Sequence, residues 1–167
     1  MTKFFTHMTS PVGPLLLLSD GEALTGLFLP NHKDGQPVAP TWQENAQATP
    51  FPQAILQLEE YFAGKRQEFD LKLQPEGTPF QLKVWAELRK IPHGQTISYG
   101  ELARRLGNPN GSRAVGLANG KNPLSIIVPC HRVIGATGKL VGYGGGLDCK
   151  QALLKLEGQG RRQESLF

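Results

Sequence analysis

IIVPCHRV, residues 126–133, is the stretch around which the chain is organised. Its first part, Ile126-Ile127-Val128, is an apolar run that predicts a buried strand or core segment. The run leads to a thiol at Cys130 with the imidazole of His131 directly after it. A cysteine is nucleophilic only as the thiolate, which a nearby base or positive charge makes available near neutral pH. A bare Cys-His pair also fits a buried structural cysteine beside an ordinary histidine, so the surrounding residues must decide.

Those surrounding residues carry a family pattern. Asn122-Pro123 and the segment SRAVGLA, residues 112–118, precede the cysteine. With PCHRV they resemble the signature of the O6-alkylguanine-DNA alkyltransferases, single-use repair proteins that move an alkyl group from damaged guanine onto their own cysteine. The resemblance extends over residues 78–157 and is most specific over 98–146. It implies a suicide methylated-DNA–protein-cysteine S-methyltransferase that acts on O6-alkylguanine in DNA, with O4-alkylthymine as a further candidate lesion.

The resemblance also implies catalytic roles for individual residues. Cys130 is the alkyl acceptor, His131 is the base that acts through a water molecule, and Glu157 polarises and orients His131. Asn122 braces the cysteine region by hydrogen bonds. Tyr99 gives a hydrogen bond to N3 of the leaving guanine and so offsets the negative charge that develops there.

Further residues are expected to bind the flipped base and the DNA. The substrate pocket is expected at Val133, Tyr143 and Gly144, where backbone carbonyls accept from the exocyclic amine and the Gly144 N–H faces O6. Some relatives carry Ser at the position of Gly144, so a role that depends on that hydroxyl is absent here. Contacts with DNA are expected from Asn108, Ser112, Arg113 and Gly116, with Arg113 as the finger that fills the space left by the extruded base.

Length, charge and cysteine content set limits on the class of protein. The net charge of +4 divides into −2 over residues 1–100 and +6 over residues 101–167, so the basic excess lies with the cysteine motif. Such a cluster is typical of a protein that binds a polyanion. No run approaches the roughly 18 apolar residues that span a bilayer, and no signal peptide is recognisable, which favours the cytoplasm. Two cysteines and scattered histidines predict no disulfide framework, no metal and no cofactor.

The first part of the chain is predicted to form a small sheet and one helix. Strands are expected over 3–8, 14–18 and 23–29, with a hairpin turn at Asp20-Gly21. The polar segment 30–50 predicts a loop, and apolar spacing predicts a helix over 52–63 that stops at Gly64. Alternation over 69–73 predicts a further short strand. This part carries no chemical motif, so its expected role is support.

The second part is predicted to be mostly helical. Thr78 and Pro79 suit the start of a helix over 79–90, whose inner face would hold Phe80, Val84, Trp85 and Leu88. Ser98 and Glu101 fit a capping box, and the helix that they begin ends at Gly107. A second helix is expected from its cap at Ser112 to about residue 119, which makes a helix-turn-helix. A last helix is expected from its cap at Asp148 to about residue 157, with Ala152, Leu153 and Leu156 inward.

These patterns predict an α+β fold in which a small N-terminal β-sheet with a helix is followed by a mostly helical domain with the helix-turn-helix and the active-site cysteine. The N-terminal supporting domain is placed at 1–76, the DNA-binding and alkyl-acceptor domain at 77–158, and a polar tail at 159–167. The second helix of the helix-turn-helix offers Ala114, Gly116, Leu117 and Ala118 but one long basic residue, Arg113. Small side chains suit sequence-independent minor-groove binding of double-stranded DNA rather than base reading. We expect a monomer.

Two other functions compete with this interpretation. A cysteine hydrolase would also use a Cys-His pair, but the local signatures of such enzymes do not occur here. A non-catalytic helix-turn-helix protein that senses damage in DNA would need no acceptor cysteine, and it is the main alternative. Transfer of one alkyl group to Cys130 would indicate an alkyltransferase and would exclude both alternatives.

Overall fold

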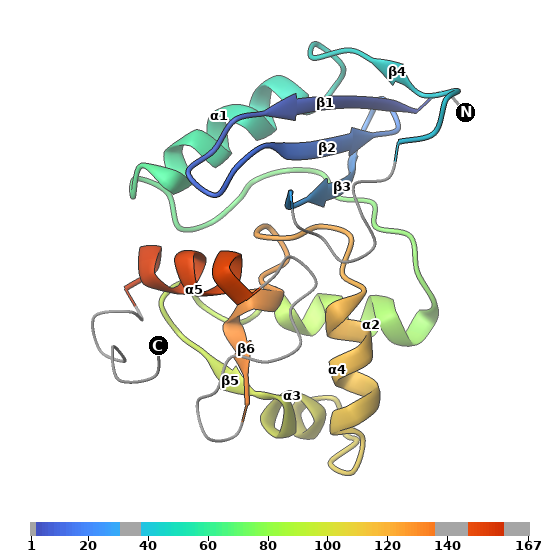
Figure 1. Cartoon of the computed structure of the whole chain (residues 1–167). Helices are drawn as coiled ribbons and strands as arrows, with labels where there is room; N and C mark the ends of the chain where they lie inside the picture. Colours follow the sequence, from blue (N-terminus) through green and yellow to red (C-terminus); the bar gives the residue numbers. More distant parts are fainter. Residues whose placement is uncertain (1–2, 31–37, 136–146, 159–167) are drawn as a thin grey trace.

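The computed structural model describes residues 3–30, 38–135 and 147–158. The fold is α+β, as predicted, with a sheet and one helix in the N-terminal half (residues 3–76) and mostly helices in the C-terminal half (residues 77–158; Figure 1). The main sheet has the strand order β3-β2-β1-β4. Its strands are β1 (Phe4–Met8), β2 (Leu15–Ser19), β3 (Leu24–Phe28) and β4 (Gln43–Glu44).

The sheet is built on antiparallel pairing of β1 with β2 and of β2 with β3, while the short β4 pairs parallel with β1. The hairpin predicted at Asp20-Gly21 is confirmed, with Gly21 at a φ of +96°. All residues of β2 are buried, which explains its continuous apolar run. The strand predictions differ from the structure in two places. The strand β4 lies inside the predicted loop, and no strand forms over 69–73.

The segment that was predicted as a strand makes only a single bridge. Leu73 is paired with Leu24, where the Leu24 N–H donates to the Lys72 carbonyl and the Gln74 N–H donates to the Leu24 carbonyl, both at 2.9 Å. Further along β3, the Leu27 N–H donates to the Pro123 carbonyl at 2.8 Å. These contacts occupy the outer edge of β3 and join the sheet to the segment before the cysteine.

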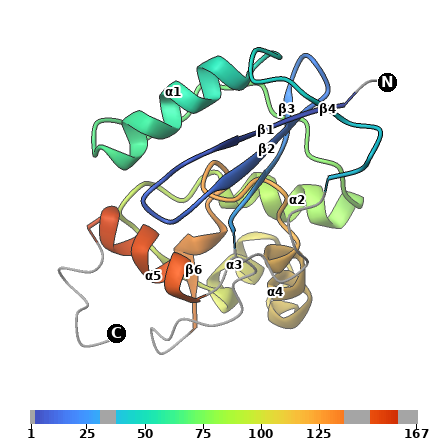
Figure 2. The ribbon, with the colours of Figure 1, turned by 45° about the horizontal axis from the view of Figure 1, so that its top comes forward.

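Helix α1 (Phe51–Phe62) lies against the sheet and buries the side chains of Phe51, Ala54, Leu58 and Tyr61 (Figures 1 and 2). The helix matches the predicted range within one residue at each end. Gly64, at a φ of +76°, ends the helical path as predicted, since glycine adopts this conformation without steric cost. Tyr61, in the last turn of α1, faces the C-terminal half.

The C-terminal half contains four α-helices, one 3₁₀ turn and a parallel pair of two-residue strands in its described part: α2 (Pro79–Leu88), β5 (Ile97–Ser98), α3 (Tyr99–Arg105), α4 (Ser112–Gly120), η1 (Cys130–Arg132), β6 (Val133–Ile134) and α5 (Leu147–Leu156). Thr78 caps α2 with a full capping box. Trp85 is core, as predicted, and its indole N–H donates to the Ala118 carbonyl at 2.9 Å, which joins α2 to α4. Phe80 was predicted inward but is 37% exposed, because the first turn of α2 extends beyond the core.

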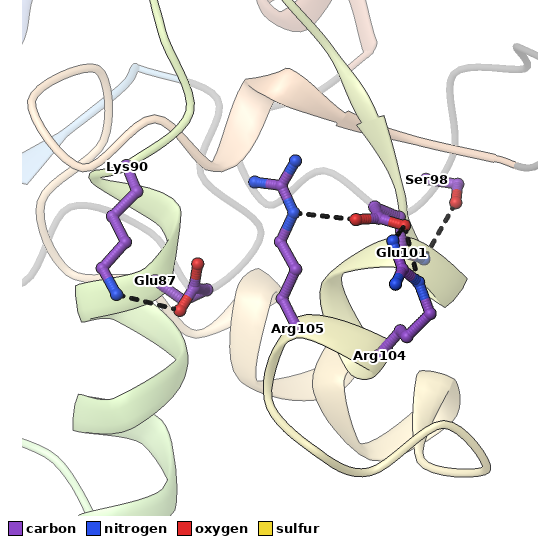
Figure 3. Close-up of polar contacts among 6 residues, drawn as sticks. All are labelled: Glu87, Lys90, Ser98, Glu101, Arg104 and Arg105. Atoms are coloured by element: carbon purple, nitrogen blue, oxygen red, sulfur yellow. Dashed lines mark hydrogen bonds and ion pairs between the residues drawn. The ribbon is translucent and has the colours of Figure 1, made fainter.

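The helix-turn-helix is formed by α3 and α4, which pack together. The Ser98 hydroxyl accepts from the Glu101 N–H at 3.0 Å, as expected of the cap. The Glu101 carboxylate does not complete a capping box, because it binds Arg104 and Arg105 instead (Figure 3). At the end of α2, in the same view, Lys90 just beyond the helix pairs with Glu87 at 3.3 Å.

Two helix starts differ from the predictions. The residue before α4 is Gly111, so Ser112 lies inside the first turn and makes no cap bond. Asp148 likewise lies within the first turn of α5. The inward face of α5 was also wrong in part: Leu153 is buried, but Ala152 and Leu156 are exposed.

The face of α5 that packs inward instead holds Lys150, Leu153 and Leu154, with Glu157 following the helix, at the i, i+3, i+4, i+7 spacing. An ionisable residue lies at each end of this face, and both of these residues are buried. Within the described ranges, no helix is both long enough and apolar enough to cross a membrane.

Candidate active site

The segment before the cysteine is a compact turn that fills the core. Ile126, Ile127 and Val128 are buried, as predicted, but they do not form a strand. The Ser125 N–H donates to the Leu27 carbonyl at 3.1 Å, and the Val128 N–H donates back to the Leu124 carbonyl at 2.9 Å. Ile126 has a φ of +74°, which a β-branched residue rarely adopts. The chain is therefore held in a costly conformation just before the cysteine, as is common at functional sites.

Asn122 ties this turn together from inside. Its side chain is 3% exposed, its Nδ2 donates to the Val128 carbonyl at 2.8 Å, and its Oδ1 accepts from the Leu124 N–H at 3.0 Å. An amide supplies a donor and an acceptor at once, which suits a turn whose backbone groups lack strand partners. This geometry fits the bracing role expected of Asn122.

Cys130 begins η1 and is 4% exposed. Its N–H donates to the Val128 carbonyl at 2.8 Å, and the following strand β6 pairs with β5, with Val133 opposite Ile97. Because Tyr99, the first residue of α3, follows β5 directly, this pairing brings the start of α3 beside the cysteine. Tyr99 and Cys130, which are 31 positions apart in the sequence, thereby share one site.

His131 and Glu157 are in direct contact. The imidazole Nε2 lies 2.8 Å from Glu157 Oε2, and both side chains are fully buried. Since a carboxylate only accepts, Nε2 carries the hydrogen, which in the neutral imidazole leaves the lone pair on Nδ1. Within the described part of the chain, Nδ1 is buried and meets no hydrogen-bond partner. This nitrogen is therefore the one that can receive a proton from the cysteine.

The Glu157 carboxylate has two further partners. Arg132 binds it in a bidentate manner, with Nε 2.8 Å from Oε1 and Nη2 3.0 Å from Oε2, and its Nη1 donates to the Ile91 carbonyl at 2.6 Å. The Tyr61 hydroxyl donates to Oε2 at 2.6 Å. Burial would raise the pKa of Glu157, but the charges and hydrogen bonds of His131 and Arg132 outweigh it and hold that pKa well below its usual range. Glu157 is therefore a fixed negative charge beside His131.

Tyr99 lies close enough to Cys130 for charge on the sulfur to affect it. Burial, and then the negative charge of Cys130, raise the pKa of Tyr99 to about 12, with a hydrogen bond from Asn119 acting in the opposite direction. The phenol therefore keeps its proton at neutral pH and can donate it. Asn119 also places its Nδ2 3.4 Å from the Cys130 carbonyl.

Lys150 is a buried cation close to Tyr99 and the cysteine. Its side chain is fully buried, its Nζ donates to the Val133 carbonyl at 2.7 Å, and Nζ lies 5.9 Å from the centre of the Tyr99 ring. Burial lowers the pKa of Lys150 to about 8, although the negative charge of Cys130 acts to raise it. A carbonyl has two lone pairs, so Val133 can accept from Lys150 and still accept from a substrate amine.

The exposed face of α4 holds Arg113, Ala114 and Leu117, and Lys121 follows at the end of the helix. Leu117 is 67% exposed, which is unusual for a large apolar side chain with no cover. A basic residue lies at each end of this face, with small or apolar side chains between. The face can therefore approach a polyanion closely while making few hydrogen bonds to it.

The remaining expected DNA and pocket residues lie in different places. Ser112 and Asn108 are exposed near the start of α4. Gly116 turns toward the site, because a Cβ there would lie 3.6 Å from the Tyr99 ring. Tyr143 and Gly144 lie outside the described residues.

Sequence reasoning missed four residues of the site: Tyr61, Asn119, Arg132 and Lys150. Arg132 belongs to the PCHRV motif but received no role. Lys150 and Glu157 could have been found together, since with Leu153 and Leu154 they make one helical face. Nothing in the local pattern of Tyr61 or Asn119 distinguishes them from ordinary helix residues.

Comparisons with known proteins cover both halves of the chain. Residues 79–159 match the DNA binding domain of 6-O-methylguanine DNA methyltransferase, and residues 3–75 match its ribonuclease-like domain. A methylated-DNA–protein-cysteine methyltransferase of Methanosarcina acetivorans is 54% identical over 155 residues, which cover 93% of this chain and 98% of that protein. One from Mycobacterium tuberculosis is 53% identical over 153 residues, or 92% and 91% of the two chains.

Solved structures agree with these relatives. The crystal structure of Mycobacterium tuberculosis OGT in complex with DNA superposes with a TM-score of 0.86 at 50% identity, covering 95% of this chain and 94% of that one. The O6-methylguanine-DNA methyltransferase of Pyrococcus kodakaraensis has a TM-score of 0.63 at 25% identity, covering 94% and 99%.

Proposed function

Because the chain belongs to the 6-O-methylguanine DNA methyltransferase family, we propose that it repairs DNA by moving the alkyl group of O6-alkylguanine onto its own Cys130. The observation that carries this proposal is the buried array of Cys130, His131 and Glu157, in which Glu157 fixes Nε2 of His131 and Nδ1 is left to act as a base. The relatives described above are named for this activity, and their matches cover nearly the whole chain.

The reaction is a substitution at the saturated carbon of the alkyl group. His131 Nδ1 takes the proton of the Cys130 thiol through a water molecule, and the sulfur forms a bond to the alkyl carbon as the bond from that carbon to O6 breaks. The electron pair of the broken bond passes to the guanine, which leaves as an anion. The product is a thioether, which water does not hydrolyse, so each molecule reacts once.

Several groups of the site stabilise the charges that appear in this step or hold the base. Glu157 faces the imidazolium that forms on His131, and the negative charge of Glu157 is already in place before the reaction. Tyr99 keeps its proton up to about pH 12 and donates a hydrogen bond to N3 of the leaving guanine. The Cys130 and Val133 carbonyls accept from the exocyclic amine, and a cation at Lys150 lies near the thiolate.

DNA is held on the exposed face of α4. Its small side chains permit close approach in the minor groove, and its few hydrogen-bonding groups give little discrimination between bases, as repair in any sequence requires. Arg113, at the start of this face, takes the space of the extruded nucleotide. The protein acts as a monomer.

Glu157→Gln is expected to slow alkyl transfer by about tenfold to a hundredfold, since an amide cannot stabilise the imidazolium on His131. The rate should be followed by transfer from duplex DNA with a single O6-methylguanine, and affinity for undamaged duplex should stay within about twofold, because Glu157 is far inside the protein. Equal rates for the variant and the wild type would remove Glu157 from the mechanism.

Affinity for undamaged duplex is expected to fall steeply with salt, and to depend little on sequence. Of the basic residues in the C-terminal half, Arg132 and Lys150 are buried and do not reach DNA, so the slope should correspond to a few phosphates rather than to the whole basic excess. Lys121→Ala should reduce the slope of log affinity against log salt by about 1. Lys72→Ala, in the N-terminal half, is the control and should leave it unchanged. One strongly preferred sequence would indicate a regulator instead.

A further inference from the structure

The N-terminal half contributes one side chain to the charge system around the cysteine. Tyr61, in the last turn of α1, is 1% exposed and donates its hydroxyl to Glu157 Oε2 at 2.6 Å. The same oxygen lies 2.8 Å from His131 Nε2. Tyr61 and Glu157 are 96 positions apart in the sequence, and they join the two halves at the point where the reaction needs a fixed carboxylate.

We propose that Tyr61 is a positioning residue for alkyl transfer, which acts by fixing the Glu157 carboxylate against His131. The inference rests on the function proposed above and assigns the N-terminal half a part in the chemistry. Tyr61 touches neither the alkyl group nor the sulfur, so its effect passes entirely through Glu157.

Without this contact, the orientation of the Glu157 carboxylate would be less well fixed. Its other partners among the described residues, His131 and Arg132, both come from η1, the turn that also carries Cys130. Tyr61 approaches from a different element and supplies a point of attachment that does not move with η1. A carboxylate held from two sides keeps one orientation of the imidazole, which a proton transfer of fixed geometry requires.

The hydroxyl is itself held in place by its ring. The ring centre of Tyr61 lies 5.6 Å from that of Phe69 and 6.2 Å from that of His93, the latter edge to face. Burial, followed by the adjacent charge of Glu157, raises the pKa of Tyr61, so the hydroxyl is a donor at every pH at which the protein is folded. A phenylalanine would fill the same space, so packing alone does not require the hydroxyl.

Tyr61→Phe is the first test, because it removes one hydroxyl and keeps the ring. We expect alkyl transfer to slow by about tenfold, the loss typical of one hydrogen bond to a charged group, both with duplex DNA and with free O6-benzylguanine. The loss should lie in the rate of transfer at saturating DNA, while the DNA concentration that gives half of this rate should stay unchanged. Affinity for undamaged duplex should stay within about twofold of the wild type, which also shows that the variant is folded.

Ile55→Val is the matched control, since it trims the packing of α1 without touching a polar group. It should leave the rate of transfer unchanged. A Tyr61→Phe variant whose rate of transfer equals that of the wild type would contradict the proposal.

A double-mutant cycle with Glu157→Gln separates action through Glu157 from a general effect. If Tyr61 acts through the carboxylate, Tyr61→Phe should cause no further loss of rate in the Glu157→Gln background. If the rate of the double variant instead falls by the product of the two single-variant losses, the inference is overturned. The wild type, measured alongside, tests the underlying function: absence of alkylation on its Cys130 would refute the proposed activity, whereas normal alkylation with an unaffected Tyr61→Phe would refute only the role of Tyr61.

Discussion

Cys130→Ser is expected to abolish alkyl transfer, by at least about 10³-fold, while the fold and DNA binding persist. A hydroxyl is a far weaker acid than a thiol, so His131 cannot generate the anion that attacks the alkyl carbon. Serine is similar in size to cysteine, and the site is 4% exposed, so little packing is lost. The measurement is the intact mass of the variant after incubation with duplex DNA that contains O6-methylguanine.

Cys149→Ser provides the matched control. Cys149 is also buried, at 5% exposure, and lies one residue before Lys150 in α5. Burial, and then the charge of Asp148, raise the pKa of the Cys149 thiol, so it is less readily ionised than an ordinary cysteine. Cys149→Ser should accept one methyl group as the wild type does. Methylation of Cys130→Ser, or its loss in Cys149→Ser, would place the acceptor elsewhere.

Arg113→Ala is expected to slow repair of duplex DNA by about ten- to a hundredfold, and to change the reaction with free O6-benzylguanine by less than about twofold. Extrusion of a nucleotide costs a few kcal/mol in lost stacking and pairing, and a planar guanidinium can stack in the vacated space while it hydrogen-bonds the orphaned base. Free base needs no extrusion, so the two substrates separate the finger from a general effect on the active site.

Two further variants define the role of Arg113. Arg113→Lys should restore little of the duplex rate, since an ammonium keeps the charge but cannot stack. Lys121→Ala removes a basic residue from the other end of the same face, and it should weaken binding without a selective loss of repair. Full rescue by lysine, or equal losses on both substrates, would mean that Arg113 contributes only its charge.

The sequence predicts well those features whose causes lie within a few residues. The hairpin at Asp20-Gly21, the helix cap at Thr78 and the helix end at Gly107 depend on local backbone preferences, and each is found. The expected contact between His131 and Glu157 came from the family pattern rather than from local chemistry, and the structure brings the two within 2.8 Å.

Features that depend on distant partners could not be predicted in this way. Tyr61 looks like an apolar-face residue of α1, and only the fold brings it to a carboxylate 96 positions away. The inward face of α5 was misassigned because it holds Lys150 and Glu157, which a hydrophobic pattern places in solvent. The segment 69–73 alternates as a strand does, yet β3 offers it only the bonds around Leu24.

These contacts change the view of the N-terminal half. It carries no motif and was expected to be a support, but α1 delivers Tyr61 to Glu157, and β3 anchors the turn before Cys130 through Leu27. Both halves therefore shape the surroundings of the cysteine.

The central claim is that Cys130 accepts one alkyl group, once. The most direct test mixes the wild-type protein with an excess of duplex DNA that contains a single O6-methylguanine, and follows intact mass, peptide mass and the amount of lesion left. We expect the protein to gain one methyl group, located on Cys130, and the reaction to stop at one lesion per molecule. Continued loss of lesion beyond that point, or a methyl group on any other residue, would contradict the account.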